Sequence, residues 1–445
     1  MARKLKPLWP EPEPLSPVVT EEQARQIANI FGTPVYVYSQ RILEEQADKA
    51  LAFPNAFGLT VRYAMKANPN SNILKIFAKK GIQIDASSGY EVRRAILAGV
   101  PPQDILLTSQ QMPDNLTELL QQGVNYTVCS LNQLDQFESR ARSHTKNKLD
   151  ISVRINPGLG SGGTNRTNTG GPASSFGIWH EQIDEVLFMA KQENLNINRI
   201  HSHIGSGSDP EVWKKVALMS LKNVKKFLDA GHNVQTLNLG GGYKVARMSY
   251  EKETDLQECG APIKEAFEKF ANGDIGRALR LEIEPGTFLV ANAGCVIARA
   301  IDYKKTPKYN FIITDSGMTE VTRPSLYGAQ HPISVIPYQD PRFIISNMRL
   351  GRFIVSGHCC ESGDILTPGK GDSEALQERE ILAPSKITGS LVVIGGTGAY
   401  CSGMSTKHYN SYPEAPEVLI DKNNKAHLIR KRGSLDDILK NEVPI

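Results

Sequence analysis

The sequence predicts an α/β plus β protein, in which a parallel (β/α)8 barrel of TIM type is followed by a C-terminal β domain. Three observations lead to this fold class. Eight short runs rich in apolar and β-branched residues recur between residues 59 and 286. Amphipathic helical patterns fill most of the gaps between these runs, and the alternation stops near residue 290. Eight such units over about 250 residues are typical of a barrel, although an open doubly wound sheet would give the same alternation.

The individual elements follow in chain order. A helix is expected at 21–32 and a strand at 34–39, before the eight runs at 59–66, 81–87, 104–109, 125–130, 149–156, 198–205, 236–242 and 279–286. Helical patterns lie at 71–81, 90–100, 116–124, 131–143, 183–195 and 213–231.

The last part of the chain has a different pattern. Runs at 298–306, 309–317, 343–349, 351–357 and 390–396 are broken by Gly, Pro and Asp, and they predict an antiparallel β-sandwich or β-barrel domain. The stretch 427–443 predicts a strand followed by a short helix. We therefore expect three parts: an N-terminal segment (1–38) packed partly on the β domain, the barrel (39–290) and the β domain (291–445).

Composition excludes several classes of protein. Lys and Arg number 51 against 47 Asp and Glu, a balance too even to suggest binding to nucleic acid or to a membrane surface. The six cysteines contain no CxxC pair, which disfavours a disulfide scaffold or a zinc site and favours reduced thiols. The N-terminus is charged and proline-rich, unlike a signal peptide, and no apolar stretch is long enough to span a bilayer. We expect a soluble, cytoplasmic protein.

Polar residues gather at the carboxyl ends of the eight runs, the end at which barrel enzymes build their active sites. They are Lys66, Asp85, Ser87, Arg154, Asn156, His203, Ser206, Gly240 to Gly242 and Glu284. A loop rich in Gly, Ser, Thr and Asn (156–177) follows one of these runs and is long enough to fold over a substrate.

Three of these features suggest chemistry. Lys66 ends a buried strand, where a desolvated amine is suited to Schiff-base formation, unless the side chain reaches past the strand into solvent. Gly240 to Gly242 expose backbone N–H groups that suit a phosphate, or simply allow a tight turn. Glu284 could keep a ring nitrogen protonated, or pair with an arginine. No GxGxxG sequence follows the first strand, so a nicotinamide-binding domain is not supported.

Two further segments carry reactive side chains. His203 could stack on an aromatic ring or be an ordinary core histidine, and zinc binding with His201 is disfavoured because no third ligand is evident. The segment HCCESGD brings together Cys360, Glu361 and Asp364, which suit a proton donor beside a cationic substrate group or else form an ordinary polar turn.

The order of the motifs resembles that of a known family. YAMKANPN, IDASSGYE, HIGSG, LNLGGGY, EIEPG, RPSLYGA, CCESGD and GAYCSGMSTKHYN occur as in the diaminopimelate decarboxylases, which are fold-type III pyridoxal 5'-phosphate (PLP) enzymes like the ornithine and arginine decarboxylases. The resemblance covers roughly residues 30–420. It implies a PLP-binding barrel, a C-terminal β domain and a homodimer whose active sites lie at the subunit boundary.

The resemblance also implies roles for particular residues. Lys66 would hold the cofactor covalently, His203 would stack on its ring and Glu284 would face its pyridine nitrogen. Further cofactor contacts would come from Asp85, Arg154, Ser206, Gly240, Gly241, Gly242, Gly286, Thr287 and Tyr400, and Glu91 would help to order the surroundings of the lysine. Substrate contacts would come from Arg323, Tyr327, Tyr400 and Glu361, with Cys360 as the proton donor; Cys360 and Glu361 would be supplied by the partner subunit.

One position departs from the family pattern. Diaminopimelate decarboxylases usually read EPGR, with the arginine on the distal carboxylate of the substrate, whereas this chain has Thr287. Arg323 and Tyr327 remain available to hold that carboxylate. The resemblance implies decarboxylation of meso-2,6-diaminopimelate to L-lysine and CO2 in lysine biosynthesis. The alternative is a related diamino acid, such as D-lysine, D-ornithine, L-ornithine or carboxynorspermidine.

Two other classes are weighed against the decarboxylase. A PLP racemase of the alanine racemase type fits HIGSG, CCESGD and the large C-terminal domain less well. A catalytically inactive regulator that keeps the fold is disfavoured because Lys66 and Cys360 are both present.

Overall fold

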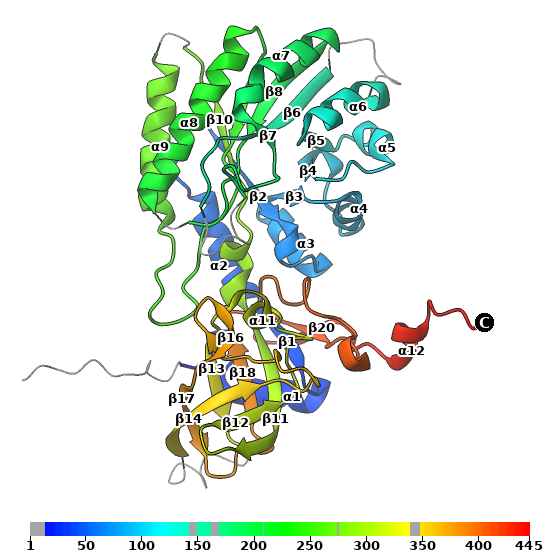
Figure 1. Ribbon diagram of the computed structural model, residues 1–445, viewed down its shortest axis with the longest axis vertical. Coiled ribbons are helices and arrows are strands. Elements are labelled where there is room, and N and C mark those ends of the chain that lie inside the picture. The colour runs from blue at the N-terminus through cyan, green and yellow to red at the C-terminus, as the bar shows by residue number, and fades with distance from the viewer. Residues whose placement is uncertain (1–13, 142–148, 162–168, 208, 274–275, 339–347) are drawn as a thin grey trace, which may run out of the picture. The chain divides into compact units, whose positions relative to one another are not determined.

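The computed structural model describes residues 14–141, 149–161, 169–207, 209–273, 276–338 and 348–445 (Figure 1). The chain forms two compact units. The barrel unit comprises Leu43–Val245 and Lys252–Leu289. The β unit comprises Met1–Ile42, Ala246–Glu251 and Val290–Ile445. The stretch Ala246–Glu251 thus lies within the range predicted for the barrel but belongs to the β unit.

Eight parallel strands of the described chain close the barrel, as the sequence predicts. The order β5-β4-β3-β2-β10-β9-β8-β6 is completed by pairing of β5 with β6, so the sheet has no free edge, and the two-residue β7 (Ile178–Trp179) extends from β6. An open doubly wound sheet is therefore excluded. The strands are β2 (Leu59–Ala64), β3 (Gln83–Ala86), β4 (Ile105–Thr108), β5 (Asn125–Val128), β6 (Leu149–Asn156), β8 (Leu195–His201), β9 (Thr236–Asn238) and β10 (Arg280–Ile283).

Helices connect the barrel strands, and several begin at side chains that cap their free N–H groups. Asn70, Ser88 and Asp209 accept hydrogen bonds from the first turns of α3, α4 and α8. The helices are α2 (Gln40–Leu51), α3 (Ser71–Lys79), α4 (Gly89–Leu97), α5 (Leu116–Gln121), α6 (Leu131–Ala141), α7 (Ile183–Gln192), α8 (Pro210–Asp229) and α9 (Leu256–Ala271). The sequence patterns indicated neither α2 nor α9.

The β unit is built on a nine-stranded sheet of order β17-β14-β12-β11-β1-β19-β20, with β18 and β13 branching from β11. The prediction of an antiparallel sheet is wrong for two pairs, because β12 runs parallel to β14 and β1 parallel to β19. Parallel neighbours need a long connection, which α11 and β13 supply in the first case and nearly the whole chain in the second.

The elements of the β unit agree with most of the predicted runs. β11, β12, β14 and β18 match the runs at 298–306, 309–317, 351–357 and 390–396, and β20 with α12 matches 427–443. Most of the predicted run 343–349 lies outside the described residues. The elements are α1 (Glu21–Phe31), β1 (Val35–Ser39), α10 (Thr287–Val290, shared with the end of the barrel unit), β11 (Gly294–Lys305), β12 (Asn310–Thr314), α11 (Arg323–Tyr327), β13 (Ile333–Ile336), β14 (Met348–Ser356), β15 (Pro368–Gly369), β16 (Asp372–Leu376), β17 (Arg379–Pro384), β18 (Leu391–Gly395), β19 (Glu417–Ile420), β20 (Ala426–Arg430) and α12 (Leu435–Leu439).

All six cysteines are free thiols. Within the described ranges, no helix combines the length and the apolar character that crossing a bilayer requires.

Candidate active site

Lys66 stands at the carboxyl end of the first barrel strand. β2 ends at Ala64, and a single 3₁₀ turn (Met65–Ala67) follows. Met65 and Ala67 are buried in this turn, whereas the side chain of Lys66 is exposed. The amine therefore emerges from the barrel on a backbone that buried neighbours hold in place, on the face where the sequence predicts the site.

Two carboxyl groups share the electrostatic surroundings of Lys66. Burial raises the pKa of Asp85 well above its usual range, and the charge of Glu284 raises it further, while Lys66 opposes both. Burial also raises the pKa of Glu91, whose Oε2 accepts the N–H of Ser87 at 2.7 Å. The lysine thus lies near two carboxyl groups that are easily protonated, and its charge favours their ionised forms.

Glu284, the residue that follows β10, carries a carboxylate that is held ionised. Its Oε1 accepts a hydrogen bond from Asn238 Nδ2 at 2.6 Å, and its Oε2 lies 3.2 Å from His201 Nε2. Burial alone would raise the pKa of Glu284, but His201 and the bond from Asn238 together lower it well below its usual range. A buried, ionised carboxylate is suited to hold a proton on a neighbouring ring nitrogen.

The alternative role for Glu284, an ion pair with an arginine, falls instead to the carboxylate two residues earlier. Glu282 Oε1 lies 3.1 Å from Arg62 Nη2, and Glu282 Oε2 lies 3.1 Å from Arg199 Nε. Glu282 is 2% exposed, so this charge group is fully enclosed within the barrel. Arg62 and Arg199 therefore neutralise Glu282. The partners of Glu284 are His201 and Asn238.

His203 is a neutral imidazole with a fixed proton position. Its Nδ1 accepts the N–H of Gly241 at 3.1 Å, so the ring proton is on Nε2. Burial lowers the pKa of His203 well below its usual range, and the charges of Arg154 and Lys66 lower it further. A neutral ring held in one orientation is compatible with stacking against a flat cofactor.

Packing alone requires glycine in the run Gly240–Gly242. The N–H groups of Gly240 and Gly241 already donate to Asn238 Oδ1 and His203 Nδ1. A Cβ at Gly241 would lie 2.0 Å from the carbonyl oxygen of Glu284, and one at Gly242 would lie 1.8 Å from that of Gly205. Only glycine fits these two positions, and Gly242 lies directly beside the backbone of Ser206.

Other predicted residues of the barrel are placed as follows. The N–H of Ser206 donates to the carbonyl of Ser161 at 3.1 Å, which fixes its backbone beside Gly242. Gly286 is buried and its carbonyl accepts the N–H of Leu289, while Thr287 opens α10. Asn156 closes the base of the 156–177 loop through two hydrogen bonds with Gly171. The middle of that loop, 162–168, lies outside the described residues.

Among the buried polar atoms of the barrel that have no hydrogen-bond partner in the described part of the chain, two share the electrostatic surroundings of Glu284. They are Asp85 Oδ1 and Arg154 Nη2, and the guanidinium of Arg154 lies 5.0 Å from the ring centre of Phe176. Buried polar groups in folded proteins are nearly always hydrogen-bonded, so such atoms point to a polar ligand. An ionised carboxylate, a neutral imidazole, a lysine and a glycine-lined turn on the same barrel face fit a charged aromatic cofactor such as PLP.

In the β unit, the HCCESGD segment separates its acidic residues. Asp364 is 2% exposed, and its two oxygens accept the N–H groups of Met318 and Cys359 at 2.6 and 2.9 Å, so it anchors the loop. Cys360 and Glu361 remain exposed. The loop thus presents a thiol and a carboxylate, and Asp364 has a structural role.

A turn that contains Tyr409 and Asn410 forms hydrogen bonds with the HCCESGD loop. The N–H of Cys360 donates to Asn410 Oδ1 at 2.8 Å, and Tyr409 Oη donates to Glu361 Oε2 at 3.3 Å. Asn410 has a φ of 51°, a conformation that costs energy for residues other than glycine. No motif or spacing in the sequence indicates these two positioning contacts.

The substrate residues predicted in the β unit lie on α11 and in a nearby turn. Arg323 Nη1 donates to His331 Nε2 at 3.0 Å, and Tyr327 Oη lies 3.9 Å from Met404 Sδ. Tyr400 occupies a left-handed conformation with φ 55°. Sequence reasoning missed His331, as it missed Asn238 and the structural partner role of His201, because none of them belongs to a motif with a recognisable spacing.

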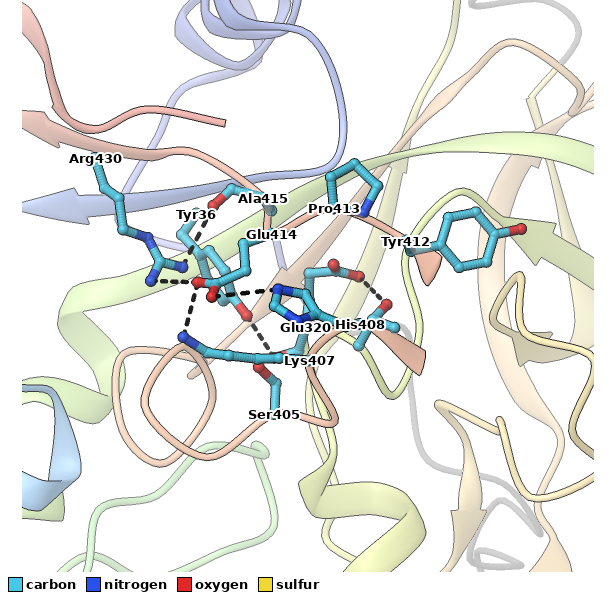
Figure 2. Close-up of a pocket in the computed structure, with 11 residues that line it drawn as sticks. Tyr36, Glu320, Ser405, Lys407, His408, Tyr412, Pro413, Glu414, Ala415 and Arg430 are labelled. Atoms are coloured by element: carbon cyan, nitrogen blue, oxygen red, sulfur yellow. Dashed lines mark hydrogen bonds and ion pairs between the residues drawn. The ribbon is translucent and has the colours of Figure 1, made fainter. Parts of the chain in front are cut away.

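Figure 2 shows a separate hollow of the β unit, which none of the predicted site residues lines. Arg430, Lys407 and His408 converge there on Glu414, with distances of 2.6, 2.7 and 3.8 Å. Because these three side chains already share one carboxylate, the hollow is not arranged to bind an anion.

Comparison with known proteins identifies the family of the chain. Residues 40–291 match the pyridoxal-binding domain of pyridoxal-dependent decarboxylases. The diaminopimelate decarboxylase of Escherichia coli K12 is 32% identical over 430 residues, covering 96% of this chain and 97% of that protein. The chain belongs to the diaminopimelate decarboxylase family.

Further relatives of this family support the same assignment. The diaminopimelate decarboxylase of Streptomyces coelicolor is 33% identical over 93% of this chain and 90% of its own length. A crystal structure of a diaminopimelate decarboxylase superposes with a TM-score of 0.84 at 32% identity, covering 94% of this chain and 96% of that one. The crystal structure of the Helicobacter pylori diaminopimelate decarboxylase, solved with L-lysine, superposes with a TM-score of 0.80 at 27% identity. The match covers 94% of this chain and 98% of that one. The protein is a PLP-dependent amino-acid decarboxylase.

Proposed function

We propose that this chain removes one carboxylate of meso-2,6-diaminopimelate as CO2 and leaves L-lysine. The observation that carries the proposal is the extent of similarity to diaminopimelate decarboxylases, which covers 96% of the chain and hence both the barrel unit and the β unit. The activity would belong to lysine biosynthesis in the cytoplasm.

PLP, when bound, supplies an electron sink for the electron pair left by the departing CO2. Lys66 would hold its aldehyde carbon, His203 its ring face, and Glu284 its pyridine nitrogen. Because Asn238 and His201 keep Glu284 ionised, that carboxylate can retain a proton on the ring nitrogen at neutral pH. Gly242 and Ser206 would meet the phosphate.

The remaining steps belong to side chains of the β unit. Cys360 Sγ would give a proton to the carbon that loses CO2, and Glu361 would pair with the ammonium group of the substrate. The Glu361 carboxylate is suited to this, since the N–H of Gly363 and the hydroxyl of Tyr409 lower its pKa. Following the family resemblance, we propose a homodimer in which the partner subunit supplies Cys360 and Glu361.

Turnover of a substrate series tests the proposal. The purified holoenzyme is incubated with meso-diaminopimelate, D-lysine, L-ornithine and carboxynorspermidine while CO2 release and the amine product are followed. We expect kcat/KM to be largest for meso-diaminopimelate. A larger value for a substrate that lacks the distal carboxylate would overturn the proposal and assign the chain to a related diamino acid, in line with Thr287.

A further inference from the structure

We propose that Arg247, together with Arg323, forms the binding site for the distal carboxylate of the substrate, the group for which this chain lacks the EPGR arginine. The inference rests on the proposed function, because it needs a substrate that ends in a carboxylate. All residues in the argument belong to the β unit, since Ala246–Glu251 is part of it.

Arg323 is held in one orientation by a buried histidine. His331 is 1% exposed; its Nδ1–H donates to the carbonyl of Gly395 at 2.9 Å, so its Nε2 is free to accept from Arg323 Nη1 at 3.0 Å. Burial lowers the pKa of His331 well below its usual range, and the neighbouring arginines lower it further. A neutral histidine adds no charge, so it orients Arg323 without neutralising it.

Arg247 is anchored by the backbone carbonyl of Gly396, the residue that follows Gly395. Its Nε donates to the carbonyl of Gly396 at 2.9 Å. A Cβ at Gly396 would lie 2.9 Å from both Cγ and Cδ of Arg247, so the arginine stem lies directly over this glycine. The consecutive carbonyls of Gly395 and Gly396 thus fix, directly or through His331, the positions of both guanidinium groups.

The two guanidinium groups influence each other. Burial lowers the pKa of Arg247, and the charge of Arg323 is the next largest cause. Burial raises the pKa of the Cys401 thiol and both arginines lower it, as expected for two groups held from the consecutive carbonyls of Gly395 and Gly396. Like charges held side by side in a poorly hydrated place are costly unless an anion joins them.

No side-chain carboxylate of the described residues forms an ion pair with either group. Arg247 Nη2 is buried and has no hydrogen-bond partner in the described chain. The nearby Glu251 uses its Oε2 for the backbone N–H groups of Arg247 and Met248 instead. A planar guanidinium with an unused Nη2, next to a second fixed guanidinium, matches the two oxygens of a carboxylate.

Product binding tests this role directly. L-lysine keeps the distal carboxylate after the reaction, whereas cadaverine is the same diamine without it. Isothermal titration of the holoenzyme should show that Arg247→Gln weakens the binding of L-lysine about 10- to 100-fold, as expected for the loss of one charge-assisted contact. The Kd for cadaverine should change by no more than about twofold. Arg247→Lys should recover part of the loss, because it keeps the charge. Arg349→Gln on the exposed part of β14 is the matched control and should change neither ligand.

Each other outcome has a distinct meaning. If Arg247→Gln weakens both ligands equally, or neither, Arg247 does not bind the carboxylate. If it instead lowers the bound cofactor, measured by absorbance of the dialysed protein, the anion is the cofactor phosphate and the substrate role is overturned. Failure of the wild-type protein to release CO2 from meso-diaminopimelate would refute the proposed function separately, while the two-ligand comparison would still decide the role of Arg247.

Discussion

Replacing Glu320 with glutamine should stabilise the protein at pH 8 and change its stability little at pH 4.5. Glu320 is 2% exposed in the β unit, and its Oε2 accepts hydrogen bonds from Ser316 Oγ, Thr319 Oγ1 and the N–H of Gly317 at 3.0, 2.8 and 3.2 Å. Burial raises the pKa of Glu320 to about 7, although these three donors oppose the rise. Between about pH 4.5 and 7 the native protein therefore keeps a proton that the unfolded chain has released.

The size and the sign of the effect of Glu320 on the free energy of unfolding follow from this pKa shift. A rise from 4.5 to about 7 corresponds to roughly 3 kcal/mol at neutral to alkaline pH, at about 1.4 kcal/mol per pH unit. Because the native state binds more protons than the unfolded state between these values, the free energy of unfolding falls as the pH rises through this window, and the loss is complete above pH 7. Glutamine keeps an oxygen for the three donors and carries no charge, so it should remove most of this loss.

Urea denaturation of the wild type and Glu320→Gln at half-unit steps from pH 4.5 to 8.5 measures the effect. The difference in the free energy of unfolding should grow from near zero to roughly 2–3 kcal/mol, with its midpoint between pH 5 and 7. Glu374→Gln, at an exposed position of β16, is the control and should give a flat profile. A difference for Glu320→Gln that does not depend on pH would refute the reasoning, since it would mean that Glu320 has the same pKa in both states.

The other predictions concern the active site. Lys66→Ala should lose covalently bound cofactor and nearly all turnover; a borohydride-sensitive cofactor band that persists would disprove the assignment. Mixing Lys66→Ala with Cys360→Ala subunits should restore up to about a quarter of the activity, and no recovery after verified exchange would mean that each subunit builds its own site. Asn410→Gly keeps the left-handed turn but loses the bond to Cys360, so kcat should fall about two- to tenfold and Asn410→Asp should retain it. Thr287→Arg should leave diaminopimelate turnover equal or higher; suppression would indicate a substrate that ends in an amine.

The barrel could be predicted from the sequence because local pattern and tertiary environment agree there. The eight runs are short, β-branched and followed by polar residues, as buried parallel strands require. Helix α9 was missed because Pro262 lies inside it and its LQECGAP start reads as a turn. The parallel pairs of the β unit were missed for another reason: nothing in the sequence of β12 or β14 records which strand lies beside it.

For the site, the sequence identified side chains at strand ends but not their partners. Lys66, His203 and Glu284 were predicted because parallel strands bring their carboxyl ends together. Asn238 and His201 hold Glu284 ionised, whereas Glu282 forms the ion pairs with arginines. This division depends on which side chains of neighbouring strands meet inside the barrel. The glycine run shows the same limit, since its packing against the carbonyls of Glu284 and Gly205 has no sequence signature.

The location of Arg247 in the β unit shows why the absence of the EPGR arginine need not mean that the chain cannot bind a distal carboxylate. A carboxylate is recognised by where guanidinium N–H groups lie in space, and a motif records only one way of placing them. Here Arg247 lies within the sequence range expected for the barrel, yet it belongs to the β unit and is fixed through the carbonyl of Gly396. Backbone carbonyls are present at every residue, so neither this anchor nor the one that Gly395 gives to His331 could be recognised before the fold was known. If Arg247 binds the distal carboxylate, Thr287 marks a relocation of the charge within the family pattern and not a change of substrate.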